Sequence, residues 1–178
     1  MKMRYLGLFV VFLLGIWGGN TVIKFKTAND APPIKTSTTL NQHMSEFTLP
    51  DLKGVKHNIT EWQGNVIILN FWATWCPPCQ KETPLFVALQ EEYGKRGVQF
   101  IGVAIDDLQK VVDFTDTYGV NYPMLVGAED AISIAKQYGN RFGSLPYTVV
   151  INRQGKITYI QNGELKRDVA EKTINTLL

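Results

Sequence analysis

An apolar segment that ends in two closely spaced cysteines is the feature that most limits how this chain can fold. Residues 66–72 read Val-Ile-Ile-Leu-Asn-Phe-Trp, almost all β-branched or aromatic, which predicts a strand buried on both faces. Cys76 and Cys79 follow, separated by two prolines, and apolar residues then recur at helical spacing as far as Gly94. The sequence therefore predicts a buried strand that delivers two thiols to the first turn of a helix.

The position of these cysteines predicts redox chemistry. The 178-residue chain contains two cysteines, and both belong to this motif. A thiol at the start of a helix lies near unpaired backbone N–H groups and the positive end of the helix dipole, which together stabilise a thiolate. A Cys-x-x-Cys pair in such a place is typical of thiol–disulfide exchange.

The longer string at residues 70–84, Asn-Phe-Trp-Ala-Thr-Trp-Cys-Pro-Pro-Cys-Gln-Lys-Glu-Thr-Pro, resembles the thioredoxin superfamily and, within it, the membrane-tethered TlpA/ResA-like branch. The resemblance covers residues 45–178. It implies an α/β, thioredoxin-like fold with an amino-terminal β-hairpin and a central insertion. It also implies a thiol–disulfide oxidoreductase whose redox centre is the Cys76–Cys79 disulfide, without a further cofactor or a metal.

The remaining pattern is compatible with that architecture. Strands are expected at 47–49 and 55–59, joined as a hairpin, and then at 98–105, 123–126, 147–151 and 156–161. Helices are expected at 108–118, at 130–138 and from about residue 165 onwards. The strand at 123–126 and the helix at 130–138 are expected to form the insertion that plain thioredoxins lack.

The amino-terminal region predicts a membrane anchor. Residues 5–23 form an apolar run behind Lys2 and Arg4, about long enough to span a bilayer. A cleaved signal peptide is the alternative, but no A-x-A-like site ends the run. We expect residues 1–26 to be a cytoplasmic flank and transmembrane anchor and 27–44 a linker. The short amino-terminal flank and the resemblance place the 45–178 domain outside the cytoplasm of a bacterium, in the periplasm.

Glu82 is the candidate proton acceptor. It lies three residues after Cys79, about one helical turn along, and can point beneath the two thiols. TlpA/ResA-like proteins carry a glutamate at the matching place, whereas the buried acid of plain thioredoxins is replaced here by Asn70, which cannot ionise. The alternative is an ordinary solvated carboxylate. Thr74, Gln80 and Lys81 are interpreted as solvated surface or capping residues.

The expected substrate contacts lie on both sides of the motif. Pro146 opens a strand, and the resemblance implies that it is the cis-proline packed against the cysteines, although a trans proline is also tolerated at a strand start. If it is cis, Leu145 would offer its backbone to an extended substrate segment. Trp75 and Pro77 are expected as exposed apolar surface next to the nucleophile, whereas Trp72 is expected in the core.

The resulting mechanism assigns different roles to the two thiols. Cys76 is expected to be the partly exposed thiol of lower pKa that attacks a substrate disulfide, and Cys79 to resolve the mixed disulfide. Glu82 would accept the proton from Cys79 and would limit the fall of the Cys76 pKa, because a nearby carboxylate disfavours a second negative charge. This argues against a very strong oxidant.

Rival classes on the same fold fit the residues less well. A thiol peroxidase of this fold carries Thr three residues before its reactive Cys, where this chain has Ala73. A copper-handling protein has a C-x-x-x-C motif and a later His, but His43 and His57 both precede the cysteines here. A zinc site lacks a second ligand pair, and haem attachment fails because Gln80 follows Cys79.

The expected partners are proteins. A net charge of +2, spread along the chain, gives no basic block for nucleic acid. The resemblance suggests reduction of disulfides in apocytochrome c or other extracytoplasmic proteins, with a thiol donor in the membrane restoring the dithiol. A general disulfide oxidant or isomerase is the alternative.

Overall fold

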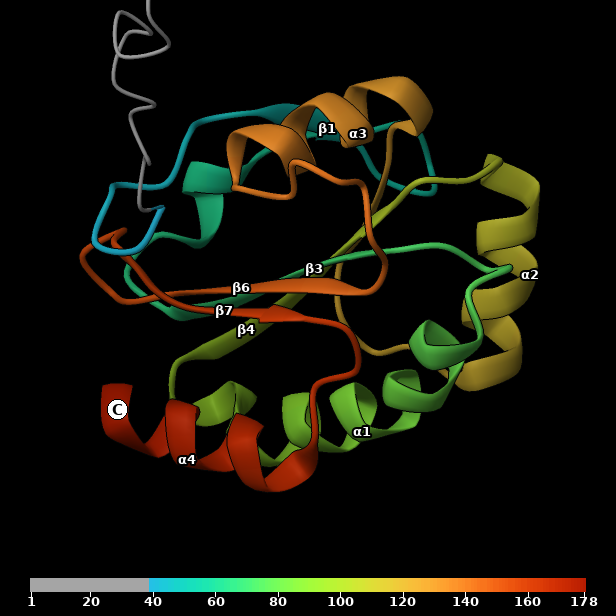
Figure 1. Ribbon diagram of the computed structural model, residues 1–178. Coiled ribbons are helices and arrows are strands. Elements are labelled where there is room, and N and C mark those ends of the chain that lie inside the picture. The colour runs from blue at the N-terminus through green and yellow to red at the C-terminus, as the bar shows by residue number, and fades with distance from the viewer. Residues whose placement is uncertain (1–38) are drawn as a thin grey trace, which may run out of the picture. The chain divides into compact units, whose positions relative to one another are not determined.

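A five-stranded sheet forms the centre of the computed structural model, which describes residues 39–178 (Figure 1). The strands are β3 (Val66–Trp72), β4 (Val98–Ala104), β5 (Met124–Val126), β6 (Tyr147–Ile151) and β7 (Ile157–Asn162). Their spatial order is β5-β4-β3-β6-β7, with β3, β4 and β5 parallel and β6 and β7 antiparallel to their neighbours. The mixed sheet confirms the predicted thioredoxin-like α/β fold.

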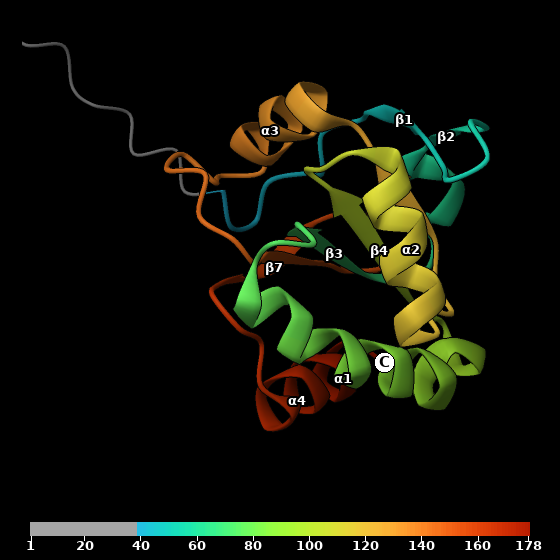
Figure 2. The ribbon, with the colours of Figure 1, turned by 90° about the vertical axis from the view of Figure 1, so that its right-hand side faces the viewer.

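Four helices cover the two faces of this sheet. They are α1 (Pro77–Tyr93), α2 (Leu108–Tyr118), α3 (Ala128–Gln137) and α4 (Arg167–Leu177). The connections β3-α1-β4 and β4-α2-β5 advance in the same direction across the sheet, so right-handed crossovers place α1 and α2 on one face. α4 lies beside α1 on that face, and α3 covers the opposite one (Figures 1 and 2).

β3 carries the core on both of its faces. All seven of its residues are buried. Because side chains alternate along a strand, Ile68 and Trp72 pack with the α1, α2 and α4 side chains, whereas Ile67, Leu69 and Phe71 pack with those of α3. The predicted doubly buried strand is therefore confirmed, and Trp72 lies in the core as expected.

The amino-terminal hairpin is also present. β1 (Thr48–Pro50) and β2 (Lys56–Asn58) pair antiparallel, and their connection passes through Gly54 at φ 82°, a left-handed conformation that glycine adopts without strain. β2 leads into a 3₁₀ helix, η2 (Ile59–Trp62), and a second one, η3 (Gly94–Arg96), follows α1. Leu49 of the hairpin is buried with the α3 side chains, so this hairpin helps to close that face.

The predicted membrane anchor and most of the predicted linker, residues 1–38, lie outside the described residues. Between residues 39 and 178 the structure contains no helix that is long and apolar enough to cross a bilayer. The last part of the expected linker lies against the domain, because the N–H groups of Asn41 and Met44 donate to the carbonyls of Ile157 and Gly155, both at 2.8 Å. This pairing occupies the beginning of the β7 edge.

Candidate active site

The two cysteines form a disulfide at the start of α1. Cys76 is the N-cap residue, with Pro77 and Pro78 at the first two helical positions, where a missing N–H costs little. The Cys76 sulfur accepts the N–H of Cys79 at 3.4 Å. The Cα atoms of the two cysteines are 5.3 Å apart. The predicted placement of a sulfur against an unpaired helical N–H is therefore confirmed.

Both sulfurs are buried in this oxidised form. Cys76 is 3 % exposed and Cys79 is 1 % exposed. The prediction that Cys76 is partly exposed is therefore wrong for the disulfide state. The reason is packing, since both cysteines belong to the hydrophobic cluster between the sheet and α1, and Leu145 packs against the same cluster. What is exposed beside them is Trp75, at 64 %.

Glu82 lies on α1, three residues after Cys79, and is 2 % exposed, so the interpretation as a solvated carboxylate is wrong. Its Oε1 accepts a hydrogen bond from Asn70 Nδ2 and its Oε2 accepts one from the backbone N–H of Leu165, both at 2.9 Å. Burial raises the pKa of Glu82 to about 7, although these two hydrogen bonds lower it, and the nearby charge of Glu164 raises it further. The group is thus poised to exchange protons near neutral pH.

The partners of Glu82 are residues that the sequence did not assign to the site. Asn70 Nδ2 also donates to Thr148 Oγ1 at 2.9 Å, so one amide joins β3, α1 and β6. Asn70 is 5 % exposed and Thr148 is fully buried. The available signal was a single polar residue inside each of two apolar strands. Nothing in the sequence indicated the backbone contact from Leu165.

The peptide bond between Leu145 and Pro146 is cis, as the resemblance implied. Pro146 is buried, and its carbonyl accepts the N–H of Gly163 at 2.8 Å. Among the described residues, no hydrogen bond is formed by the backbone N–H or C=O of Leu145. Its main chain is therefore available to pair with another extended segment.

A small apolar cavity lies beside Trp75, the residue before Cys76. Its volume is about 170 Å³, and its lining is shared by the segment before α1, the end of β4, α3 and the loop before β6, namely Trp75, Ile105, Ile132, Ala135, Asn140, Gly143 and Leu145. Phe142, on the same loop, is 94 % exposed and was not singled out from the sequence. Pro77 is also exposed. The residues on either side of Cys76 in the chain, Trp75 and Pro77, are therefore exposed and apolar.

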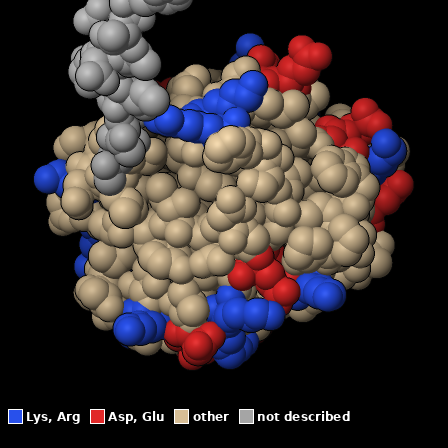
Figure 3. All heavy atoms as spheres, in the orientation of Figure 1, with Lys and Arg blue, Asp and Glu red and all other residues tan. Residues whose placement is uncertain are grey.

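The molecular face seen in Figure 3 is largely uncharged. Lys, Arg, Asp and Glu side chains lie mostly toward its upper, lower and right-hand parts, with both signs side by side. On the same side of the molecule lie β6 and β7 (Figure 1). A surface of this kind suits contact with a polypeptide, because few charges have to be desolvated.

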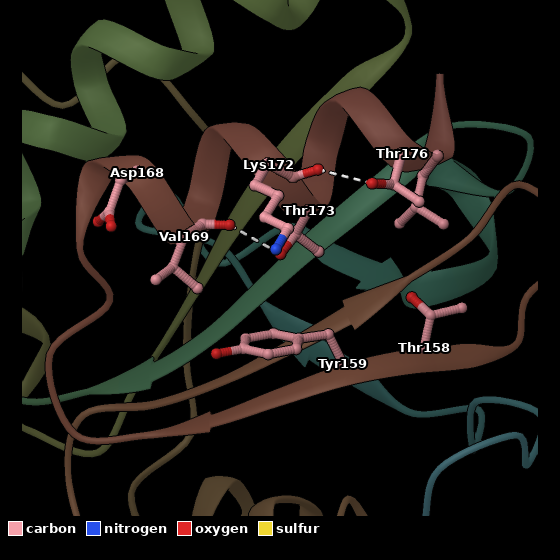
Figure 4. A pocket seen from close by; sticks show the side chains of 8 residues that line it. Thr158, Tyr159, Asp168, Val169, Lys172, Thr173 and Thr176 are labelled. Atoms are coloured by element: carbon pink, nitrogen blue, oxygen red, sulfur yellow. Dashed lines mark hydrogen bonds between the residues drawn. The ribbon is translucent and has the colours of Figure 1, made fainter.

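A second hollow, between β7 and α4, has a volume of about 460 Å³ (Figure 4). Its hydroxyl groups are already used within the fold: Thr173 donates to the Val169 carbonyl at 2.7 Å and Thr176 to the Lys172 carbonyl at 2.8 Å. None of its lining residues belongs to the disulfide site. We therefore assign no chemistry to it.

Within residues 39–178, no three His, Cys, Asp or Glu side chains are grouped so that they could hold a metal ion. Position 73, where a peroxidase of this fold would place Thr, holds the buried Ala73.

Comparisons with known proteins agree with this geometry. The model of the Redoxin family matches residues 19–178. The chain is 31 % identical over 144 residues to the thiol-disulfide oxidoreductase ResA of Geobacillus thermodenitrificans, covering 80 % of both chains. It is 34 % identical over 127 residues to ResA of Halalkalibacterium halodurans, covering 71 % of this chain and 70 % of the other.

Solved structures show the same fold. A thiol:disulfide interchange protein of the thioredoxin family from Chlorobium tepidum matches with a TM-score of 0.70 and 25 % identity, over 77 % of this chain and 96 % of that chain. A secreted thiol-disulfide isomerase from Corynebacterium glutamicum matches with a TM-score of 0.71 and 22 % identity, over 77 % of this chain and 86 % of that chain.

Proposed function

Because this chain belongs to the redoxin family and is a thiol–disulfide oxidoreductase of the ResA and TlpA type, we propose that it reduces disulfides in extracytoplasmic proteins. The burial of Glu82 one helical turn from Cys79 is the observation that favours reduction, rather than oxidation, of client proteins. An ionised carboxylate beside a dithiol disfavours the thiolate. Strong oxidants of this class depend on a stabilised reduced form, so a carboxylate that weakens the stabilisation of the thiolate favours reduction of the partner.

The reaction begins with the reduced dithiol. The Cys76 thiolate attacks one sulfur of the client disulfide, a Cys76–client bond forms, and the client S–S bond breaks. The second client sulfur leaves as a thiolate and takes up a proton. The N–H of Cys79 and the start of α1 stabilise the Cys76 thiolate before the attack.

Resolution of the mixed disulfide needs a base. The Cys79 thiol gives its proton to the Glu82 carboxylate, and the resulting thiolate attacks the Cys76 sulfur. The Cys76–Cys79 bond forms while the bond to the client breaks, and the client sulfur leaves as a thiolate that is then protonated. Two electrons pass to the client, and the enzyme is left in the disulfide form.

The client is held as an extended segment. Its backbone would pair with the free N–H and C=O of Leu145, beside Pro146, and its apolar side chains would contact Trp75 and Pro77. The 170 Å³ cavity is lined mainly by apolar groups and has room for one apolar side chain. Apocytochrome c is one class of client that the resemblance suggests.

The disulfide is the only redox group that this mechanism requires, so neither a further cofactor nor a metal takes part. A membrane protein that donates thiol equivalents would restore the dithiol. The apolar run at residues 5–23 supports a single-pass anchor. The short amino-terminal flank and the likeness to the ResA and TlpA type support an extracytoplasmic domain, on the same side as this donor. We propose no role in nucleic-acid binding.

The reduction potential tests the direction. The protein is equilibrated with glutathione redox buffers, and the fraction of Cys76–Cys79 disulfide is measured by alkylation and mass spectrometry. A value near that of thioredoxin, about −270 mV, supports a reductase. A value near that of the strong periplasmic oxidant DsbA, about −120 mV, would overturn the proposal in favour of an oxidant.

A further inference from the structure

The turn before Cys76 is held by a carboxylate from the neighbouring strand. Asp106 follows β4 closely, and its side chain is 3 % exposed. Its Oδ2 accepts both the backbone N–H of Thr74, at 3.0 Å, and the Thr74 hydroxyl, at 2.5 Å. Its Oδ1 accepts the N–H of Asp107 at 2.8 Å, and Lys110 Nζ lies 3.7 Å away. Because β3 and β4 are parallel, their carboxyl ends meet at one edge, which brings Asp106 to the turn.

The carbonyl of Thr74 is fixed from the other side. Gln80 Nε2 donates to this carbonyl at 2.7 Å, and the backbone N–H of Gln80 donates to the Cys76 carbonyl at 3.1 Å. The N–H, the hydroxyl and the C=O of Thr74 are therefore all bound. The expectation that Thr74 and Gln80 are solvated surface residues is wrong, because both are partly buried and their side chains bind the turn to Asp106 and to α1. The capping alternative describes Gln80 better, since its side chain binds a carbonyl just before the helix.

The Asp106 side chain favours its ionised form although it is buried. Burial alone raises a carboxyl pKa, but the hydrogen bonds from Thr74 and Asp107, together with the charge of Lys110, outweigh it and hold the pKa of Asp106 below its ordinary value. A charged acceptor of two hydrogen bonds makes stronger contacts than a neutral one. The two hydrogen bonds from Thr74 to Asp106 are therefore stronger than bonds to a neutral acceptor would be.

We propose that Asp106 is a positioning residue for thiol–disulfide exchange, which acts through Thr74 to keep the Cys76 sulfur at the amino terminus of α1. In the disulfide form the covalent bond to Cys79 also fixes this sulfur. Once that bond is reduced, the turn must hold Cys76 in place if its thiolate is to accept the Cys79 N–H. The proposal applies to exchange in either direction, so it does not depend on the reductase role.

Two effects of Asp106 on the Cys76 pKa have opposite signs, which makes the proposal testable. A negative charge near the site disfavours a thiolate, so removal of charge alone would lower the pKa of Cys76. Loss of positioning would raise that pKa, because the sulfur would leave its N–H partner. Asp107 provides the matched control, since its side chain is 75 % exposed and bonds to Lys110 at 2.7 Å without touching Thr74.

The experiment compares Asp106→Asn with Asp107→Asn in the full-length reduced protein. The rate of Cys76 alkylation by iodoacetamide is measured against pH, as is the rate of exchange with bis(2-hydroxyethyl) disulfide. An amide has one acceptor oxygen, so Asn at 106 cannot hold both Thr74 and Asp107. We expect Asp106→Asn to raise the apparent Cys76 pKa and slow exchange at neutral pH by at least about threefold. Asp107→Asn should do neither.

Thr74 variants separate position from charge and decide the matter even if Asp106→Asn does not fold. Thr74→Val removes the hydroxyl at nearly constant size, and Thr74→Ser retains it. We expect Thr74→Val to change the alkylation profile in the same direction as Asp106→Asn and Thr74→Ser to restore the wild-type profile. Identical profiles for Thr74→Val and Thr74→Ser, or for Asp106→Asn and Asp107→Asn, would overturn the proposal.

Discussion

The side-chain amide of Asn70 donates a 2.9 Å hydrogen bond to the carboxylate of Glu82, and both side chains are buried. A neutral donor stabilises the ionised carboxylate without adding a charge of its own. With the Leu165 N–H it opposes the effect of burial, which leaves the Glu82 pKa at about 7. A base with this pKa is populated in both protonation states at neutral pH, as a group that takes and returns a proton must be.

The raised pKa predicts how stability depends on pH. A carboxyl whose pKa is higher in the folded state stabilises the fold fully below the unfolded pKa, about 4.5, and this contribution is lost as the pH rises through about 7. The shift corresponds to at most about 3 kcal/mol. We therefore expect the free energy of unfolding of the wild-type disulfide form to fall relative to Glu82→Gln by about 1–3 kcal/mol between pH 4.5 and 8.

Urea unfolding of the two proteins at several pH values measures this difference. Gln keeps the shape of Glu82 but does not titrate, so other ionisable groups cancel in the comparison. Parallel stability curves across the whole interval would show that Glu82 titrates in the folded protein as it does in the unfolded chain.

The pKa of Glu82 should depend on Asn70 more than on Thr148, which is the second acceptor of the Asn70 amide. Asn70→Leu removes one of the two donors to Glu82, so we expect the pKa of Glu82 to rise further and the fold to lose about 1–3 kcal/mol through the unpaired Oε1 atom. Thr148→Val is the matched control, because it removes the other acceptor of the same amide and leaves the Glu82 contact. NMR titration of the Glu82 carboxyl carbon reports the pKa directly. Equal shifts in the two variants would contradict this assignment.

Features of the site that depend on residues close in the chain could be predicted from the sequence, whereas contacts between distant residues could not. The strand at 66–72, the thiols after it and the burial of Glu82 could be anticipated, because periodicity, helix spacing and resemblance all concern residues close in the chain. The contacts of Asn70 with Thr148 and of Glu82 with Leu165 join residues 78 and 83 positions apart. Such pairs depend on how the strands and helices pack, which local pattern does not specify.

The contact between Asp106 and Thr74 is a second example that local sequence pattern does not specify. Its place after a buried strand was visible, but an acidic pair such as Asp106-Asp107 is typical of a solvated helix start. Only the parallel pairing of β3 with β4 brings one of the two to Thr74. The burial of Cys76 was missed for a related reason, because exposure depends on neighbours such as Leu145 that arrive from a distant part of the chain.

The two cysteines should behave differently when replaced. Cys79→Ala removes the resolving thiol, so we expect mixed disulfides between Cys76 and client proteins to accumulate and to be visible on non-reducing gels. Cys76→Ala should trap few or none, because the remaining thiol lies inside α1 and lacks the N-cap position that stabilises the Cys76 thiolate. Trapping by Cys76→Ala at the level of Cys79→Ala would reverse the two roles.

The anchor is tested by fractionation of the full-length protein. If the apolar run at residues 5–23 is retained, the protein should sediment with membranes, resist a carbonate wash and be released only by detergent. The physical reason is the free-energy cost of moving about twenty apolar residues from lipid to water. Intact mass should then show an amino terminus at Met1 or Lys2.

The side of the membrane on which the domain lies is measured in intact cells that contain the same full-length protein. With the outer permeability barrier opened, a membrane-impermeant maleimide should label the reduced cysteines in intact cells if the domain is extracytoplasmic, and cell lysis should add no further labelling. The Cys76→Ala, Cys79→Ala double variant is the control, since these are the chain's two cysteines. A soluble protein whose mature end lies between residues 20 and 31 would identify the segment as a signal peptide. That result would remove the tether and leave the exchange chemistry intact, because every side chain it requires lies between Asn70 and Leu165.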